Sequence, residues 1–295
     1  MTETHLLSIR DPRTEPNAGL SWRERLARLR TELASLRKVV VAYSGGVDSS
    51  LVLRVAHEQL GEGALGVIGR SDSYALHELE LALAQAADFG AAIQVVTTGE
   101  LSNPSFASNP ADRCYHCKSE LYRQLDAVAA RFGAAAILDG TIADDLHDHR
   151  PGRRAAEERS VRSPLADLGF TKADVRAAAA ELGLASREKP ASPCLASRIP
   201  YGTAITAEIL ERVERSEAAL RALGFAELRV RHHGDVARVE IPLADVPRLL
   251  EPGVREAAVQ ALRAAGYRFV SLDLEGLRSG SLNRVLESGG MQGPA

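Results

Sequence analysis

The sequence has no long apolar segment, and no run approaches the eighteen or so residues that a membrane-spanning helix needs. Its opening residues, MTETHLLSIRDPRTEP, do not follow the basic and then apolar order of a secretory signal. Hydrophobic residues make up 45% and charged residues 25% of the 295 residues, as in an ordinary globular protein. We therefore expect a cytoplasmic protein with no membrane partner.

Lysine and cysteine are scarce. Only four of the 36 basic residues are lysines, and the arginines that carry the rest of the positive charge suit phosphates and carboxylates. The net charge of −3 provides no general attraction to a polyanion, so we expect no nucleic-acid partner. There are three cysteines, an odd number, and a disulfide framework is not expected in a reducing compartment.

Short apolar runs alternate with helical patterns in the first half of the chain. The periodicity predicts helices over 49–60, 74–88 and around 121–132, and strands at 38–43, 64–69, 91–96 and 135–140. This alternation with buried, non-alternating strands predicts an α/β fold with a doubly wound parallel sheet. Ligands in such folds bind beyond the carboxyl ends of the strands, so we expect the four loops that follow the strands to surround one crevice.

The pattern changes after a helix that is predicted to begin at 171. A stretch rich in proline and serine, 186–204, is typical of a linker or an ordered active-site loop. Beyond it the sequence predicts a smaller α+β domain with a helix over 206–223, helical turns over 243–265, and strands at 226–232, 236–241 and 268–273. The predicted organisation is a flexible leader (1–17), an α/β domain (18–200), an α+β domain (201–285) and a flexible tail (286–295).

The strongest local signal is Ser44-Gly45-Gly46-Val47-Asp48-Ser49-Ser50, between the first predicted strand and a helix. Glycines let the backbone turn tightly, and the helix N-terminus together with the Ser44, Ser49 and Ser50 hydroxyls can hold phosphate oxygens. The spacing is not that of the Walker loop. The motif resembles the loop with which the ATP pyrophosphatase superfamily binds ATP. That resemblance implies that Asp48 helps to hold the Mg²⁺ that bridges the phosphates.

A second signal, Asp139-Gly140-Thr141-Ile142-Ala143-Asp144-Asp145, follows the fourth predicted strand and should lie beside the same crevice. Neighbouring carboxylates next to a polyphosphate are candidate Mg²⁺ ligands, and we include Asp145 in the predicted nucleotide site. The alternative is that Asp144 caps a helix and Asp145 faces water.

The three cysteines form the third signal. Cys114 and Cys117 share one face if a helix begins near 111, and Cys194 follows a proline in the second half of the chain. Three thiolates suit a 4Fe–4S cluster with one iron left open. A zinc ion completed by His116 or water, a redox C-x-x-C pair with an unrelated Cys194, and inert thiols are the alternatives.

Together these motifs resemble the ATP-dependent sacrificial sulfur transferase (LarE) family of nickel-pincer nucleotide cofactor biosynthesis. The resemblance extends from about residue 20 to about residue 285. It is carried by AYSGGVDSS, RCYHCK, DGTIADDLHDHRPG, PCLASRIPYG, RVRHHGDVARVE and LDLEGLRSG. The first motif is common to the superfamily, whereas the proline-cysteine loop and the C-terminal motifs are narrower.

The resemblance implies a specific reaction. ATP activates a carboxylate of a pyridinium mononucleotide as an acyl-adenylate, and sulfur then displaces AMP to give a thiocarboxylate. In the single-cysteine branch, the residue that matches Cys194 gives up its own sulfur and becomes dehydroalanine. This chain also carries Cys114 and Cys117, so it resembles a three-cysteine branch in which all three thiols hold a 4Fe–4S cluster that delivers sulfide. We predict the cluster route.

The resemblance also implies a substrate site and partners. Arg229 and Arg278 match arginines near the substrate phosphates, Glu217 matches a carboxylate of the same site, and Arg198 lies on the cysteine loop. We interpret His232 and His233 as structural. The implied partners are the mononucleotide substrate, other proteins of the nickel-pincer pathway and further copies of the chain.

Two other functions stay open at this point. A tRNA thiolase would need a basic face for a polyanion, which the acidic pI of about 6.3 does not favour. A non-catalytic sensor that binds ATP and a cluster would release no pyrophosphate in response to a carboxylate substrate. Amidating enzymes of the superfamily, such as GMP and NAD synthetases, would not require three thiols.

Overall fold

The computed structural model describes residue 17 and residues 19–147, 151–190 and 192–278. The predicted leader, apart from residue 17, and the predicted tail lie outside the described residues. The chain divides into two compact units, and both are discontinuous in sequence. The first unit comprises residues 1–69, 78–96 and 121–191, and the second comprises residues 70–77, 97–120 and 192–295. The domain limits 18–200 and 201–285 stay a prediction.

The first unit is built on a four-stranded sheet with the order β3-β2-β1-β4. Its strands are β1 (Val39–Ala42), β2 (Ala64–Arg70), β3 (Ala92–Thr97) and β4 (Ala136–Leu138). The central strand β1 pairs in parallel with β2, from Val39 opposite Ala64, and with β4, from Val39 opposite Ala136. The sheet confirms the predicted α/β class.

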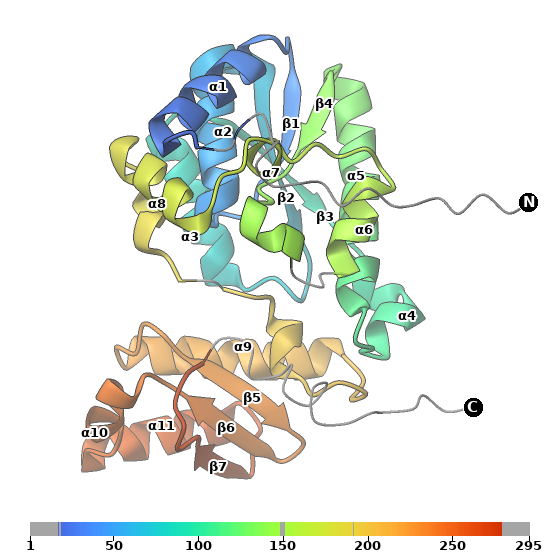
Figure 1. The fold of residues 1–295 in the computed structure, drawn as a ribbon. Helices are drawn as coiled ribbons and strands as arrows, with labels where there is room; N and C mark the ends of the chain where they lie inside the picture. The colour runs from blue at the N-terminus through green and yellow to red at the C-terminus, as the bar shows by residue number, and fades with distance from the viewer. Residues whose placement is uncertain (1–16, 18, 148–150, 191, 279–295) are drawn as a thin grey trace, which may run out of the picture. The chain divides into compact units, whose positions relative to one another are not determined.

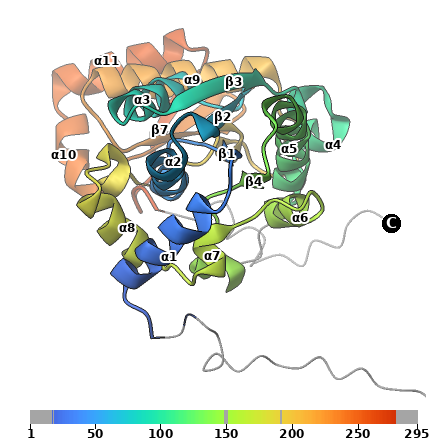
Figure 2. The same ribbon diagram turned by 90° about the horizontal axis from the view of Figure 1, so that it is seen from above.

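Helices cover both faces of this sheet. Helices α2 and α3 lie on one face and α5 on the other, and α1 and α8 pack against α2 (Figures 1 and 2). The helices that contribute to this unit are α1 (Trp22–Ala34), α2 (Val47–Leu60), α3 (Leu76–Asp88), α5 (Arg113–Phe132), α6 (Pro151–Glu157), α7 (Pro164–Asp167) and α8 (Lys172–Glu181). The first residues of α3 and α5 belong to the second unit.

Burial follows the position of each strand in the sheet. The three valines of β1, Val39 to Val41, are fully buried because helices cover both faces of the central strand. Strand β3 lies at the edge and contains only exposed and half-buried residues, so the prediction of a buried strand is wrong there. An edge strand has a neighbour on one side only, which leaves more of its surface to water.

The second unit contains a three-stranded sheet and its helices. Strand β5 (Arg229–His233) pairs antiparallel with β6 (Val236–Glu240), which pairs in parallel with β7 (Phe269–Leu272). The remaining helices are α4 (Pro104–Ala107), α9 (Ala207–Ala222), α10 (Val246–Leu249) and α11 (Pro252–Ala264). Helices α9 and α11 pack together, and one apolar core includes Leu220, Val230 and Leu262.

The proline-rich stretch 186–204 has local structure in its described residues. It contains the end of the 3-10 helix η5 (Ala185–Glu188) and the whole of η6 (Leu195–Arg198). Cys194 is the N-cap residue of η6. The stretch is therefore an ordered loop on either side of residue 191 rather than a linker without structure.

Candidate functional site

The glycine-serine loop of the first unit forms the turn between β1 and α2. Gly45 has φ +69°, and a Cβ placed on it would lie 2.5 Å from the Cβ of Ala82. Only glycine fits this conformation and this close approach. Gly46 has φ −77°, and a Cβ placed on it would have its nearest neighbour 3.5 Å away, so it needs no such freedom. Of the two glycines predicted to form the turn, only Gly45 has a backbone conformation and a close neighbour that require glycine.

The serines of this loop hold its shape. The hydroxyl of Ser49 lies 3.1 Å from that of Ser44, and it accepts the backbone N–H of Ser44 at 3.2 Å. The Ser50 hydroxyl is fully buried and donates to the carbonyl of Gly46 at 2.8 Å. Ser50 therefore stabilises the turn, and the phosphate contact predicted for its hydroxyl stays a prediction.

The loop after β4 meets this turn, as the fold predicts. A Cβ on Gly140 would lie 2.6 Å from the backbone nitrogen of Ser49, so the loop that carries the Asp139–Asp145 motif passes directly beside the start of α2. The predicted crevice includes two further loops that belong to the second unit, and it stays a prediction as a whole.

The carboxylates of the motif already have hydrogen-bond donors. Asp139 accepts the hydroxyls of Thr141 and Ser163, each at 2.8 Å. Asp144 accepts the backbone N–H of Lys172, the first residue of α8, at 2.9 Å, and Asp145 accepts that of Ile142 at 3.1 Å, while the N-cap residue of α8 is Thr171. A Mg²⁺ role for Asp145 stays a prediction.

Two lysines that sequence reasoning missed lie at the loop. The ammonium of Lys172 contacts both carboxylate oxygens of Asp48, and that of Lys189 donates to the carbonyl of Gly45 at 3.3 Å. Lys189 also pairs with Glu78 at 2.6 Å. The chain has only four lysines, so two of them beside one phosphate-type loop indicate a site for an anion. Lys172 and Lys189 are far from the loop in the sequence, however, so the sequence alone does not show that they lie beside it.

The second unit brings two of the three cysteines to one place. Cys117 and Cys194 both pack against an apolar cluster that includes Phe106, Leu195 and Ile199. The backbone N–H of Leu195 donates to the carbonyl of Ser73 at 2.8 Å, which fixes the loop next to Cys194. The three cysteine side chains are thiols, and Cys114 is exposed at the start of α5.

Cys117 lies in an environment that opposes ionisation. Burial raises the pKa of the Cys117 thiol well above its usual range, and the nearby Glu100 and Cys194 raise it further. Glu100 is 2% exposed, accepts the Ser73 hydroxyl at 2.9 Å, and has one carboxylate oxygen within 4.0 Å of the Cys117 sulfur. Sequence reasoning missed Glu100, because an isolated glutamate after a strand has no distinctive pattern.

The thiols fit an iron–sulfur cluster by donor chemistry, since sulfur is the ligand that such clusters take from proteins. Cys117 and Cys194 pack against the same apolar cluster, and a cluster held by all three thiols stays a prediction. Within the described ranges, no group of three or more His, Cys, Asp or Glu side chains is already arranged to hold a metal ion. His116 is the residue that would complete a zinc site in the alternative prediction. Its Nε2 lies 3.9 Å from the Oδ1 of Asp112.

Arg198 and Glu217 form a buried ion pair next to the loop that carries Cys194. The guanidinium of Arg198 contacts both oxygens of Glu217, at 2.8 and 3.1 Å, and also donates to the carbonyl of Cys194 at 3.3 Å. Burial alone would raise the pKa of Glu217, but Arg198, the backbone N–H of Val230 and Arg221 outweigh it and hold that pKa below its usual range. The substrate role of both residues stays a prediction, while the structure shows them positioning the loop.

Arginines gather at the start of β5. Arg229 donates to the carbonyl of Arg278 at 2.9 Å, and burial together with Arg231 and Arg198 lowers the pKa of Arg229. Arg278 itself pairs with Glu275. Arg231, which sequence reasoning quoted within a motif but did not select, binds Glu240 through two hydrogen bonds and donates to the carbonyl of Ser197 at 2.7 Å. Guanidinium groups such as that of Arg229, which donates to a backbone carbonyl here, suit a phosphate group.

The fold and the loop define the first unit as a domain of the ATP pyrophosphatase type. No protein-family model matches the sequence. Part of the chain is 26% identical over 200 residues to a subunit of the glutamine-hydrolysing GMP synthase of Methanoregula boonei, covering 63% of this chain and 62% of that protein. This similarity agrees with the superfamily.

Similarity over nearly the whole chain defines the family. The sequence is 41% identical over 261 residues to the pyridinium-3,5-bisthiocarboxylic acid mononucleotide synthase of Lactiplantibacillus plantarum, covering 88% of this chain and 94% of that enzyme. It is 45% identical over 262 residues to an uncharacterised Synechocystis protein, covering 89% and 98%. The chain belongs to the family of this synthase, the sacrificial sulfur transferase (LarE) family that its motifs resemble.

In the described ranges no helix is long and apolar enough to cross a membrane.

Proposed function

We propose that this chain is an ATP-dependent sulfur transferase that converts a carboxylate of a pyridinium mononucleotide into a thiocarboxylate. The observation that carries the proposal is the 41% identity, over most of both chains, to a synthase of a pyridinium bisthiocarboxylic acid mononucleotide. The fold adds a loop suited to ATP in the first unit, and the second unit adds thiols and arginines suited to the sulfur step and to a substrate phosphate.

The first step is adenylation. A carboxylate oxygen of the substrate attacks the α-phosphorus of ATP, a new O–P bond forms, and pyrophosphate leaves with the electrons of the broken P–O bond. The Ser44–Ser49 loop and the α2 N-terminus would hold the pyrophosphate. Asp48 would bind Mg²⁺ after releasing Lys172, which is then free to contact a phosphate oxygen.

The second step delivers sulfur. A sulfide nucleophile attacks the acyl carbon, and AMP leaves with the electrons of the broken C–O bond, which yields the thiocarboxylate. Cys114, Cys117 and Cys194 would hold a 4Fe–4S cluster, which supplies transferable sulfide when bound. The shared packing of Cys117 and Cys194 supports this assignment. Arg198, through its contacts with the cysteine loop and Glu217, positions Cys194.

The remaining parts of the proposal concern the substrate and the cellular setting. Arg229 and Arg278 would contact the substrate phosphate, with Arg198 and Glu217 at the same site. We expect a cytoplasmic protein, because thiols and a cluster require a reducing compartment. We also expect a homo-oligomer. Other proteins of the nickel-pincer pathway would supply the substrate and use the product.

The test uses the full chain prepared anaerobically, with ATP, Mg²⁺, a carboxylated pyridinium mononucleotide and sulfide. We expect pyrophosphate release that depends on the mononucleotide, a thiocarboxylate product by mass spectrometry, and more than one product per chain with Cys194 intact. Cys194 converted to dehydroalanine, with one product at most per chain, would support single-turnover donation instead. Pyrophosphate release that does not respond to the mononucleotide contradicts the proposed function.

Metal analysis of the same preparation tests the cluster separately. We expect about four irons and four sulfides per chain and a brown absorbance, with each of Cys114→Ala, Cys117→Ala and Cys194→Ala losing them. Arg131→Ala, at an exposed position of α5, is the control. Zinc in place of iron under these conditions contradicts the cluster.

A further inference from the structure

Asn109 is a fully buried residue with an uncommon backbone conformation. It lies in the second unit between α4 and α5, and its φ of +58° is in the left-handed region. Residues other than glycine rarely adopt this conformation, although asparagine and aspartate tolerate it better than most. Such a conformation persists only where the surrounding contacts hold it.

The amide of Asn109 contacts the loop that follows Cys194. Its Nδ2 lies 2.8 Å from the carbonyl oxygen of Pro200, 3.0 Å from that of Thr203 and 3.3 Å from that of Ile199. An amide nitrogen has two hydrogens, so the three carbonyls share them. This one side chain therefore joins two segments that are 90 to 94 residues apart in the chain.

Backbone hydrogen bonds join the same two segments. The N–H of Gly202 donates to the carbonyl of Asn109 at 3.0 Å, and the N–H of Ile205 donates to that of Ala107 at 2.7 Å. We refer to these two bonds and the contacts of the Asn109 amide together as the Asn109 clamp. All of its residues belong to the second unit.

Arg113, the first residue of α5, supports the clamp. It is 4% exposed and donates to the Oδ1 of Asn109 at 3.0 Å, so both ends of the amide are paired. Its guanidinium also lies 4.6 Å from the centre of the Tyr201 ring, which is part of the same loop. A buried polar network whose groups are paired specifies one arrangement, whereas apolar packing by itself is less specific.

The clamp lies between the two segments that carry the thiols. Asn109 precedes Cys114 by five residues and Cys117 by eight, and Ile199 follows Cys194 by five. Cys117 and Cys194 also pack against the same apolar cluster. The clamp therefore fixes the position of the cysteine loop relative to the start of α5.

We propose that Asn109 is the positioning residue of the sulfur site, which sets the separation of Cys194 from Cys114 and Cys117. A metal site tolerates ligand distances only within about 0.2 Å of their ideal values, so a small shift of the loop would remove a ligand. With the loop held, a metal has to turn only the thiol side chains. The link to sulfur delivery rests on the proposed function, whereas the arrangement of the thiols does not.

Asn109→Asp tests the clamp without changing the size of the residue. Aspartate tolerates the left-handed conformation and still accepts from Arg113, but it has no N–H to donate to the three carbonyls. Asn109→Gly, which tolerates the same φ, is a second variant in case the first does not fold. Asn103→Asp is the matched control, because Asn103 is exposed and accepts the N–H of Ser105 as the N-cap of α4, which aspartate also does.

Anaerobic titration of the full, metal-free chain with Cd²⁺ measures how many thiolates share one ion, through the ultraviolet sulfur-to-cadmium absorbance. We expect three thiolates on one Cd²⁺ in the unmodified chain and in Asn103→Asp. Either Asn109 variant should have fewer thiolates per ion and bind at least about tenfold more weakly, with an unchanged circular dichroism spectrum. Unchanged Cd²⁺ binding in a folded Asn109 variant would overturn the proposal, as would fewer than three thiolates per ion in the unmodified chain.

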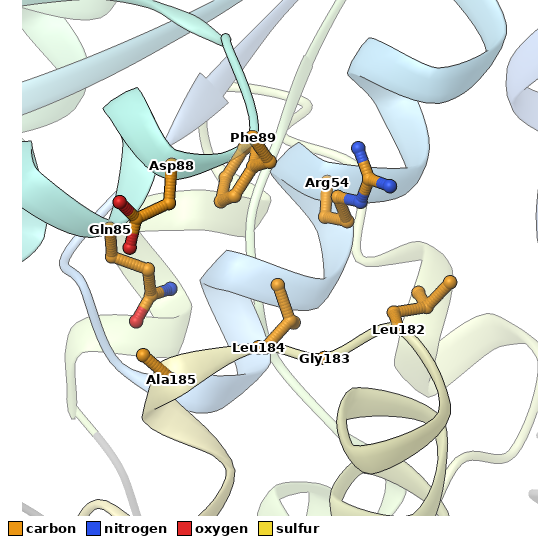
Figure 3. A pocket seen from close by; sticks show the side chains of 8 residues that line it. All are labelled: Arg54, Gln85, Asp88, Phe89, Leu182, Gly183, Leu184 and Ala185. Carbon is orange, nitrogen blue, oxygen red and sulfur yellow. The ribbon is translucent and has the colours of Figure 1, made fainter.

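Hydrogen exchange, followed by mass spectrometry of peptides, distinguishes positioning from a general loss of stability. Asn109→Asp should speed exchange over 199–205 at least about tenfold. The reference is Leu184 of the first unit, which lines the cavity in Figure 3 and whose N–H donates to the carbonyl of Ala179 at 2.9 Å. Exchange at the reference should not change. Equal acceleration in both peptides would overturn the positioning role, because the variant would then destabilise both units alike.

Iron and sulfide analysis separates this proposal from the proposed function. An unmodified chain that holds Cd²⁺ with three thiolates but assembles no cluster would contradict the cluster and support the role of Asn109. A complete cluster in both the unmodified chain and Asn109→Asp would support the cluster and overturn the role of Asn109.

Discussion

The Nζ of Lys172 lies 2.8 Å from one carboxylate oxygen of Asp48 and 2.7 Å from the other. Lys172 is the first residue of α8, and Asp48 is in the first turn of α2, so two helices contribute to this pair. The pair places a positive charge at the carboxylate that is predicted, from the family resemblance, to bind Mg²⁺. In the proposed reaction, the metal takes over that carboxylate and the ammonium becomes available to a phosphate.

The pair gives the first prediction. Asp48→Asn keeps the size of the side chain but removes the charge that binds Mg²⁺, so we expect pyrophosphate release to fall at least a hundredfold while the circular dichroism spectrum is unchanged. Glu80→Gln, on the exposed face of α3, is the control and should keep full activity. Normal release by the Asp48 variant would remove this residue from the mechanism.

Lys172→Met tests the second partner. If the ammonium contacts a phosphate of bound ATP, the KM for ATP should rise about tenfold or more, which corresponds to about 1.4 kcal/mol. Stability should change little, because the ammonium is partly exposed and an ion pair of this kind contributes about 0–1 kcal/mol. Steady-state kinetics over a range of ATP concentrations measures the effect. An unchanged KM and kcat would show that Lys172 only partners Asp48 in the ATP-free protein.

The two glycines of the loop form a matched pair. Gly45→Ala forces a side chain into a left-handed conformation and against Ala82, so it should cost about 1–3 kcal/mol or more of unfolding free energy and abolish pyrophosphate release. Gly46→Ala has space and ordinary dihedral angles, and it should change stability by less than about 1 kcal/mol. Urea unfolding measures both. Equal costs for the two variants would contradict this account of the turn.

The buried pair of Arg198 and Glu217 predicts a pH dependence of stability. The pKa of Glu217 lies below its ordinary value of 4.5 in the folded state, so its stabilisation is fully present above pH 4.5 and is lost as pH falls through the lowered folded pKa. Glu217→Gln leaves Arg198 buried without its counter-charge and should cost about 3–5 kcal/mol at pH 7. Urea unfolding at pH 7, 4 and 3 should show the gap between the two proteins narrowing with acid. A gap that stays constant would mean that Glu217 is not ionised in the folded protein.

Thiol reactivity tests the environment of Cys117. Its raised pKa keeps it protonated at pH 8, and since the thiolate is the reactive form, iodoacetamide should modify Cys117 at least tenfold more slowly than the exposed Cys114 in metal-free protein. Glu100→Gln removes a negative charge beside the sulfur and should speed its modification, whereas Asp72→Asn, an exposed control, should not. Peptide mass spectrometry measures both rates. Equal rates at the two cysteines would contradict the raised pKa of Cys117.

Local patterns were enough for the α/β class and for most elements. The buried valines of β1 and the helical spacing of α2 are properties of short segments, so the sequence predicts them to within a few residues. The exposure of β3 was not predictable from its apolar run, because being at the edge of a sheet depends on strand order. The small helices α4 and α7 were missed because each has only four residues.

The sequence by itself determined the glycine-serine loop, the three thiols and the family, because each rests on residue types at fixed spacing in the chain. Only the tertiary structure decided that Lys172 pairs with Asp48, that Glu100 lies beside Cys117, and that Arg198 and Glu217 are buried together behind the cysteine loop. These relationships join segments that are 17 to 124 residues apart in the chain. Charge and burial act through space, so partners that distant become visible only when the chain has folded.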